Sequence, residues 1–483
     1  MTVIHARLEH AEADPERLAF DIAGRALTRA ALVDGARRVA AGLAASGVRP
    51  GDRVALALGT SPELVWSFFG AELARAVPVA LDTHLSAQAV ARRIALVESA
   101  RVVDAAEASR LLAHAPLAPA ALPAPSDLAF LQVTSGTSGE PRAVMISHAN
   151  VLASVLGSRE SLALRPGDVF ASWMPIHHDL GLVDFMLLPA HAGLPCWLLP
   201  PSLAQIRPWL QLMSRVGATI TGAPDFAYRL AARIADDAGA AQPIDLARLR
   251  IAISGGEPLR AATIAAFEAR WSIPGRVRPG YGLAEATLGV TFVRAGEPLR
   301  VDASGSVSAG RAAPGAEVRV RDGQIEVRGA KVCAGYFGDA AASAALFTDD
   351  GWLRTGDSGA LDDDSYLFVH GRQRAMIKRA GAVVAPREVE EAAERAPGVR
   401  LSAAVGIARE EGGTEDVVVV VEVAPEVAAD TAAADAITRA VADEVLRALG
   451  FAPGRIVVAP PRTIPRTANG KIRHAALRQT LGG

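Results

Sequence analysis

Apolar residues alternate between helix-like and strand-like spacing through most of the chain. Between Thr28, a favourable helix cap, and Gly47, a favourable helix stop, apolar positions recur every three or four residues and predict a helix. The apolar run at 54–58 predicts a buried strand, a second helix is expected after Ser61, and residues 78–82 form another strand-like run. Alternation of this kind favours an α/β fold with mostly parallel sheets.

The C-terminal part of the chain has a pattern of its own. Residues 417–421 are apolar at every position, as expected of a strand covered on both faces. A helix is predicted over 437–449, where apolar residues recur every four positions and Gly450 follows as a stop. We therefore expect a large N-terminal domain, 1–371, and a smaller C-terminal domain, 372–483.

Composition excludes several classes of protein. The chain has 483 residues, of which 50% are hydrophobic and 21% are charged, so it has enough apolar material for a large core. Lys and Arg total 50 against 52 Asp and Glu, and the net charge of −2 offers no basic field for nucleic acid. The apolar stretches are interrupted before they reach the ~20 residues that a membrane-spanning helix needs.

Location and connections follow from smaller features. The N-terminal segment lacks a basic region followed by an apolar one, so we expect no secretory signal. The cysteines Cys196 and Cys333 lie in no CxxC pair and fit a reducing compartment. Residues 105–127, rich in alanine and proline, predict a surface connection. The sequence therefore predicts a cytoplasmic protein with no membrane span.

Hydroxyl residues and glycines gather in a short loop after the apolar run 128–133. The loop residues are Thr134, Ser135, Gly136, Thr137, Ser138 and Gly139, with Arg142 shortly after them. Glycine lets backbone N–H groups approach a phosphate, and the hydroxyls add donors without bulk. The same composition is typical of an ordinary polar turn, and the GxxxxGK[ST] pattern of a P-loop is absent. The loop alone leaves both interpretations open.

Further segments follow this loop in a fixed order. They are SGGEP (254–258), GYGLAEAT (280–287), WLRTGD (352–357), GR (371–372) and PRTANGKIR (465–473). With the hydroxyl–glycine loop, these segments resemble the signatures of the adenylate-forming superfamily. That superfamily includes acyl-CoA synthetases, fatty acyl-AMP ligases, luciferases and the adenylation domains of peptide synthetases. The resemblance extends over most of the chain.

The resemblance implies an α/β fold with a large, multi-subdomain N-terminal domain and a small, mobile C-terminal domain. It also implies a reaction in which a carboxylate attacks the α-phosphate of ATP. That step joins two anions, so positive charge must meet them in the transition state. By resemblance, Lys471 bridges the substrate carboxylate and the α-phosphate, and Glu285 holds Mg²⁺. The structural alternatives are a solvated surface lysine and a charge at a helix N-terminus.

The same resemblance assigns a set of residues to the nucleotide. Tyr281, beside Gly282, is expected to stack on adenine, and Asp357 to accept hydrogen bonds from both ribose hydroxyls. Core packing and a turn are the structural alternatives for these two side chains. Arg372 would add a donor near the ribose or phosphates. The segment of Gly255, Gly256 and Glu257 corresponds to the strand end on the adenine side, where glycines bring the backbone close to the base; a simple turn is the alternative.

Three positions depart from the family pattern. Arg142 replaces the lysine that is usual after the phosphate loop, and Ala143 replaces the glycine that follows it. Arginine keeps the charge but changes the geometry of its donors. At the hinge, Arg374 stands where the family usually carries Asp or Lys.

The segments at 172–182 and 221–228 most resemble fatty acyl-AMP ligases. By that resemblance His178 lies beside the acyl carboxylate, although a lone histidine is often only structural. Aromatic residues are expected to line an apolar acyl tunnel, although part of the set is ordinary core: Trp173, Phe185, Phe226 and Tyr228.

The sequence says less about the molecule that accepts the acyl group. Only a short stretch separates Thr287 from Val307, so the insertion that hinders CoA in fatty acyl-AMP ligases is absent, and Gly381 matches a glycine on the pantetheine path. We predict that ATP and Mg²⁺ activate a medium- or long-chain acid to acyl-AMP with release of pyrophosphate. The acyl group then passes to an acyl carrier protein or CoA. The alternatives are an amino-acid or aryl-acid adenylating enzyme and a non-catalytic nucleotide- or acyl-adenylate-binding protein.

Overall fold

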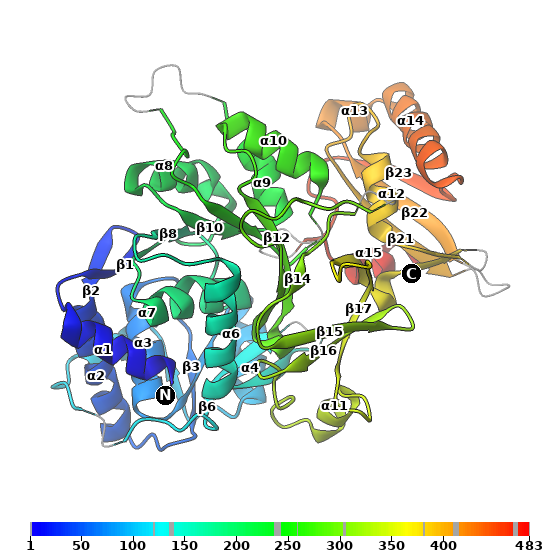
Figure 1. Cartoon of the computed structure of the whole chain (residues 1–483). Helices are drawn as coiled ribbons and strands as arrows, with labels where there is room; N and C mark the ends of the chain where they lie inside the picture. Colours follow the sequence, from blue (N-terminus) through cyan, green and yellow to red (C-terminus); the bar gives the residue numbers. More distant parts are fainter. Residues whose placement is uncertain are drawn as a thin grey trace.

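A mixed nine-stranded sheet runs through the larger part of the chain (Figure 1). In the computed structural model its strand order is β14-β13-β12-β11-β10-β8-β9-β1-β2. The strands are β1 (Leu18–Ile22), β2 (Arg25–Thr28), β8 (Phe170–Ser172), β9 (Cys196–Leu198), β10 (Ile220–Ala223), β11 (Ile251–Ser254), β12 (Val277–Leu283), β13 (Leu288–Phe292) and β14 (Arg311–Ala312). The strands from β12 to β1 run parallel, and antiparallel strands close both edges.

The structure describes residues 2–118, 121–134, 140–235, 243–257, 259–302, 306–379, 382–408, 415–466 and 472–482. Within these ranges no helix is both long and apolar enough to cross a lipid bilayer. The α/β fold class predicted from the sequence is confirmed.

The N-terminal elements follow the predicted alternation. Helix α2 (Arg29–Ala45) begins at Thr28, whose hydroxyl accepts the amide of Ala31 at 3.1 Å. Helix α3 (Pro62–Leu73) begins after Ser61, which caps it in the same way. Strand β3 (Arg53–Leu56) lies between β4 (Val77–Ala80) and β5 (Arg101–Val103) in a parallel three-stranded sheet. Both helices and both strands predicted for this part of the chain are confirmed.

The predicted surface connection at 105–127 is wrong for its first part. Helix α5 (Ala105–Leu112) forms there, and the Asp104 carboxylate caps it by accepting the Glu107 amide. Ala108 and Leu111 are buried against the core. The prolines that suggested a connection all lie after this helix.

Two antiparallel units connect to the large sheet. Strands β6 (Leu128–Thr134) and β7 (Arg142–Ser147) form a hairpin in which Thr134 pairs with Arg142. A four-stranded sheet is made of β15 (Ala316–Arg321), β16 (Gln324–Gly329), β17 (Leu353–Leu361) and β18 (Leu367–Arg372). The hairpin contacts the segment between β16 and β17, since Val144 forms an antiparallel bridge with Tyr336.

The C-terminal segment has its own cores (Figure 1, orange to red). Its sheet contains β21 (Leu401–Ala408), β22 (Glu415–Glu422) and β23 (Arg455–Ala459), covered by α12 (Pro386–Ala393) and α14 (Thr431–Leu449). The two buried clusters of this segment contain only residues between Ile377 and Leu481. The predicted strand at 417–421 lies within β22, and α14 ends at Gly450 with φ +75°, so both predicted elements are confirmed.

Two side chains of opposite charge, Asp184 and Lys331, are fully buried and influence each other electrostatically. Asp184, on helix η1 (Leu180–Leu187), and Lys331 are each 0% exposed, and the Lys331 ammonium donates to the Gly289 carbonyl at 2.8 Å. Burial raises the pKa of Asp184 to about 7, although Ser158 and Lys331 pull it down. Burial also lowers the pKa of Lys331 to about 8, against the attraction of Asp184.

We expect Asp184→Asn to stabilise the protein in a pH-dependent way. Because the folded-state pKa of Asp184 lies above the ordinary value of about 3.9, the fold loses stability as pH rises from about 4 to about 7. The variant removes that cost, so its free energy of unfolding should exceed the wild-type value by about 4 kcal/mol at pH 8. The difference should vanish towards pH 4. Denaturant unfolding at several pH values, with the exposed Asp349→Asn as control, measures this, and a pH-independent difference would contradict it.

Candidate active site

Three neighbouring parallel strands end at the same edge of the large sheet. Strand β10 leads into α9 (Asp225–Ala232), β11 ends before Gly255, and β12 leads into the turn that carries Glu285. The carboxyl ends of parallel strands meet at one edge, where α/β proteins usually bind ligands. This topology brings three of the segments singled out in the sequence together.

The strand end after β11 is tightly packed. A Cβ on Gly255 would lie 3.1 Å from the Gly280 carbonyl oxygen, and Gly256 has φ +83°, which favours glycine. The Glu257 carboxylate accepts the Phe226 amide at 2.9 Å, so it joins this strand end to α9. Close packing at Gly255 and the left-handed backbone at Gly256 thus explain both glycines, and the Glu257 carboxylate binds the backbone of α9.

Tyr281, Asp357 and Arg372 form one polar group. The Tyr281 hydroxyl donates to Asp357 Oδ2 at 2.7 Å, and Arg372 Nε lies 3.0 Å from Asp357 Oδ1. Asp357 and Arg372 are register partners on β17 and β18, whereas Tyr281 comes from β12. Both oxygens of the predicted ribose ligand therefore hold protein donors.

The electrostatics keep this group in defined protonation states. Burial and the Asp357 charge raise the pKa of Tyr281 well above its usual value, so the phenol remains a neutral donor. Burial lowers the pKa of Arg372, but Asp357, Tyr281 and the carboxylate of Glu285 outweigh it and leave that pKa raised. Arg372 is thus a permanent cation at the edge of the sheet.

Glu285 has a partner that the sequence did not reveal. Glu285 lies in the short helix η3 (Ala284–Ala286), and its Oε1 accepts the Tyr336 hydroxyl at 2.8 Å. The Arg142 guanidinium lies over the Tyr336 ring, 4.9 Å from its centroid. Burial and Glu285 raise the pKa of Tyr336, so it too stays neutral. The only sequence signal for Tyr336 is an aromatic pair between two glycines at 335–338.

The turn that presents Glu285 is fixed by its backbone. A Cβ on Gly282 would lie 1.9 Å from the Leu288 carbonyl oxygen, so only glycine fits there. Thr287 has φ +49°, and its hydroxyl donates to the Lys331 carbonyl at 2.7 Å. The Glu285 carbonyl accepts the Cys333 amide at 2.8 Å. Gly282 therefore serves the close approach of two strands.

The histidine segment lies beside strand β6. The Gln132 amide donates to the His177 carbonyl at 2.7 Å, which joins the turn before η1 to the strand that ends at Thr134. His178 Nδ1 lies 2.7 Å from the Asp179 carboxylate. Burial lowers the pKa of His177 to about 4, so this ring is neutral near pH 7. The structure thus places His178 and Thr134 on connected segments.

The predicted tunnel aromatics divide into two groups. Trp173, which follows β8, packs its ring 6.2 Å from that of Phe226 at the start of α9. Within the part of the chain that the structure describes, the buried Trp173 Nε1 has no hydrogen-bond partner. Tyr228 is fully buried and donates to the Ile253 carbonyl, and Phe185 is fully buried against Gly222. Tyr228 and Phe185 are thus packed among protein atoms, and their place along an acyl tunnel stays a prediction.

Several predicted residues lie outside the described residues. They are Ser135, Gly136, Thr137, Ser138, Gly139, Gly381 and Lys471, together with the side chain of Arg374. The described residues that flank Lys471 are joined to each other, since Arg466 and Ile472 form an antiparallel bridge. Arg374 is the middle residue of the short helix η4 (Gln373–Ala375).

Comparison with known proteins defines the class. The AMP-binding enzyme family model matches residues 8–337. The chain is 30% identical to the long-chain-fatty-acid–AMP ligase FadD26 of Mycobacterium marinum, over 88% of this chain and 86% of that protein. It is 31% identical to the medium-chain-fatty-acid–[acyl-carrier-protein] ligase TtuA of Teredinibacter turnerae, over 74% of this chain and 63% of that protein.

Two solved structures are similar to this chain over its whole length. One from studies of fatty acyl-adenylate ligases of E. coli and L. pneumophila has a TM-score of 0.86 at 27% identity, covering 100% of this chain and 98% of that one. The ATP-bound RpMatB-BxBclM chimera B1 has a TM-score of 0.88 at 27% identity, covering 100% and 99%. The fold is that of an adenylate-forming ligase. The chain belongs to the AMP-binding enzyme family, and its relatives include fatty acyl-AMP ligases.

Proposed function

We propose that this enzyme activates a medium- or long-chain fatty acid with ATP, forming fatty acyl-AMP and pyrophosphate. The observation that carries the proposal is the meeting of Tyr281, Asp357 and Arg372 with the pair Glu285 and Tyr336 at the carboxyl edge of the sheet. This arrangement offers an aromatic ring and a carboxylate for a nucleoside. It also offers a cation and a second carboxylate for phosphates and their counter-ion.

Glu285 fits a magnesium ligand by its chemistry. Among the described residues no group of three or more His, Cys, Asp or Glu side chains is arranged to hold a metal ion. Mg²⁺ commonly binds through one or two carboxylates and takes its other ligands from phosphates and water. When bound there, Mg²⁺ would neutralise phosphate charge. Glu285, Arg372 and Arg142 then surround the phosphates, and Lys471 brings the cation that meets both reacting anions.

Apolar surroundings favour a fatty acid over an amino acid. The two aromatics placed beside the sheet edge, Trp173 and Phe226, are buried and carry no charge. FadD26 and TtuA are both named for fatty acids. Asp179, the nearest candidate for pairing with an amine, lies 2.7 Å from His178. These observations support an alkyl chain next to the nucleotide site.

The second half of the proposal concerns transfer. The adenylate passes its acyl group to a phosphopantetheine thiol, on a carrier protein as in the name of TtuA or on CoA. The segment after residue 371 acts as a separate small domain that moves between the two half-reactions. The separate cores of that segment support this division.

Pyrophosphate release over a panel of acids tests the proposal. The panel contains octanoic, dodecanoic and hexadecanoic acids, anthranilic acid and phenylalanine, each with ATP and Mg²⁺ and first without an acceptor. We expect release with the fatty acids and thioester formation when CoA or a holo-carrier protein is added. Release only with phenylalanine or anthranilic acid would select the amino-acid or aryl-acid alternative. No release with any acid would select a non-catalytic binder.

A further inference from the structure

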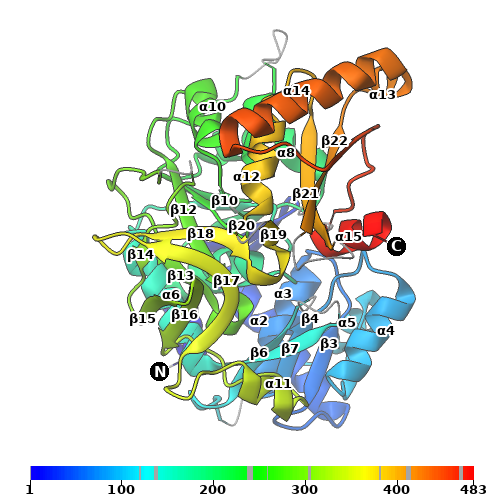
Figure 2. The same cartoon turned by 90° about the vertical axis from the view of Figure 1, so that its right-hand side faces the viewer.

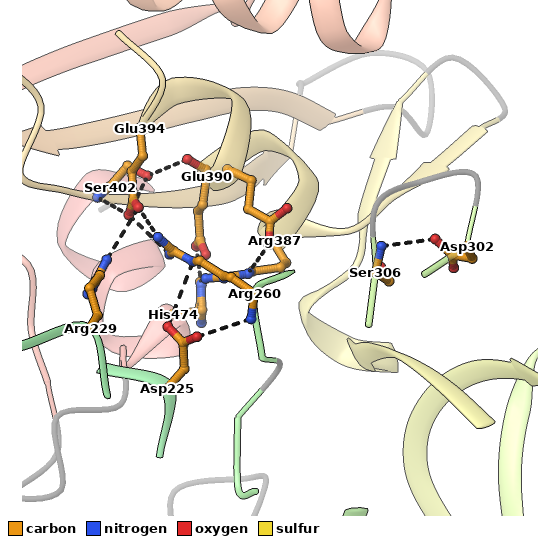
Figure 3. A network of polar contacts seen from close by, with 11 residues as sticks. Asp225, Arg229, Arg260, Asp302, Ser306, Arg387, Glu390, Glu394, Ser402 and His474 are labelled. Carbon is orange, nitrogen blue, oxygen red and sulfur yellow. Dashed lines mark hydrogen bonds and ion pairs between the residues drawn. The ribbon is translucent and has the colours of Figure 1, made fainter. Parts of the chain in front are cut away.

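Helix α12 contacts both the large part of the protein and the start of the last helix. It packs on β21, beside which Figure 2 shows it, and Glu394 at its end contacts Arg229 on α9 and Arg260 just before α10 (Ala261–Trp271). It carries Glu390, and Glu394 caps its C-terminal end four residues later; Figure 3 shows the polar contacts of both carboxylates. Side chains at this spacing lie on the same face of a helix, one turn apart.

Glu394 completes a charge cluster on the large part of the protein. It accepts hydrogen bonds from Arg229 Nη1 at 3.3 Å and from Arg260 Nη2 at 3.2 Å. Asp225 accepts the backbone amide of Arg260 at 3.0 Å. None of these four side chains is more than 19% exposed.

The charges explain why this contact matters. Without Glu394, the cluster contains the guanidinium groups of Arg229 and Arg260 and the carboxylate of Asp225. One positive charge is then not neutralised. Glu394 brings the cluster to neutrality, and its Oε1 also accepts the Ser402 amide at 3.1 Å within its own domain. Removing one partner of a buried charge group is costly because the other is left without compensation. The Glu394 contact therefore stabilises the docked position of the C-terminal segment on α9 and α10 relative to a separated position.

Glu390 makes the second contact, towards the end of the chain. It is 3% exposed, and its Oε1 accepts the Ala404 amide at 3.0 Å and lies 2.6 Å from His474 Nε2. His474 is the first residue of α15 (His474–Gly482), and it follows Lys471 by three positions. The Glu422 carboxylate, 3.4 Å from Arg466 Nη2, holds the other side of the same segment.

The charged groups around His474 set its titration. Burial lowers its pKa, but the Glu390 charge and hydrogen bond outweigh burial and the repulsion of Arg387, so the pKa is raised. Burial alone would raise the pKa of Glu390. The charge and hydrogen bond of His474 outweigh burial, so the pKa of Glu390 is lowered. The ion pair is therefore present between the lowered pKa of Glu390 and the raised pKa of His474, and it is lost as pH rises through the pKa of His474.

We propose that α12 is a coupling helix, in which Glu394 docks the small domain on Arg229 and Arg260 while Glu390 fixes, through His474, the segment that carries Lys471. The proposal rests on the proposed function and adds positioning residues to it. Helix α12 then determines two positions. One is that of the small domain on the large domain, and the other is that of His474, three residues after Lys471. Neither glutamate needs to touch the substrate.

Two readouts test the coupling, and one of them needs no activity. Hydrogen exchange of the α15 amides reports on the Glu390–His474 contact, and ATP–pyrophosphate exchange with dodecanoic acid reports on adenylation. The variants are Glu390→Gln, His474→Gln, His474→Arg and Glu394→Gln. Glu444→Gln is the matched control, because it removes an ion pair with Arg447 on α14 that touches neither contact.

We expect Glu390→Gln and His474→Gln to speed α15 amide exchange and to slow ATP–pyrophosphate exchange, each about tenfold, as for a lost charge-assisted contact. His474→Arg should restore both values and remove the loss of wild-type activity at high pH. Glu394→Gln should slow ATP–pyrophosphate exchange while α15 keeps its protection, and should expose the amides at the start of α10. Glu444→Gln should resemble the wild type.

Two results would overturn the proposal. One is unchanged α15 protection in His474→Gln and Glu390→Gln, and the other is a His474→Arg variant as impaired as His474→Gln. If the wild type shows no ATP–pyrophosphate exchange, the proposed function fails, and the hydrogen exchange of α15 still decides whether α12 holds this segment.

Discussion

Replacing Lys471 by alanine is expected to abolish acyl-AMP formation while ATP binding stays close to the wild-type value. The reaction joins a carboxylate to a phosphate, so a cation that meets both anions acts mainly in the transition state. We expect the adenylation rate to fall on the order of 10³-fold, at the upper end of what one electrostatic contact contributes. ATP–pyrophosphate exchange measures the rate, and calorimetric titration with ATP measures binding.

The surroundings of this segment make the experiment interpretable. The Arg473 amide donates to the Pro465 carbonyl at 2.8 Å, and Arg466 bridges Ile472, so the segment stays tied at both ends when residue 471 changes. Arg455→Ala, which removes an exposed cation from strand β23, is the matched control and should keep full activity. Lys471→Arg keeps the charge in a broader, planar group and should recover only part of the rate. Equal loss of ATP binding and of chemistry would contradict the assigned role.

The scarcity of lysine strengthens this expectation. The chain has three lysines, Lys331, Lys378 and Lys471, among 50 basic residues, so arginine is its ordinary cation. Lys331 is an example of such a lysine, because its compact ammonium is fully buried and donates to the Gly289 carbonyl at 2.8 Å. A lysine at 471 likewise suits a site where one small cation must approach two anions.

Local signals explain why much of the fold was predictable. Thr28 and Ser61 bind the first free amides of the helices that follow them, and Gly450 takes the left-handed conformation that ends α14. Each of these effects depends on a few neighbouring residues, so the sequence reveals it directly. The apolar run at 417–421 is equally local, since a strand covered on both faces needs only apolar residues.

Contacts between distant segments were not predictable in the same way. Tyr336 binds Glu285, and Arg142 lies over the Tyr336 ring, although these residues come from three separate parts of the chain. Glu394 meets Arg260 across 134 positions of sequence. Nothing in the local pattern of either segment specifies such a partner. Tyr228 is a similar case, because the sequence did not indicate that its hydroxyl donates to the Ile253 carbonyl on a neighbouring strand.

Glu285→Gln is expected to lower the catalytic efficiency of adenylation about 100-fold and to shift its dependence on Mg²⁺ to much higher concentrations. Glutamine keeps the size of the side chain and an oxygen that still accepts the Tyr336 hydroxyl, so the turn should remain folded. It loses the negative charge that a hard divalent cation prefers in its ligands. Initial rates of pyrophosphate release over a Mg²⁺ titration measure both effects.

The matched control for this charge removal is Glu317→Gln, which breaks an exposed ion pair with Arg328 on the four-stranded sheet and should leave the Mg²⁺ dependence unchanged. Tyr336→Phe, which removes only the hydroxyl at Glu285, should lower the rate less and keep the Mg²⁺ dependence near that of the wild type, because the carboxylate remains. If Glu285→Gln lost activity with an unaltered Mg²⁺ dependence, the carboxylate would act on the nucleotide or on the turn, and the magnesium role would be wrong.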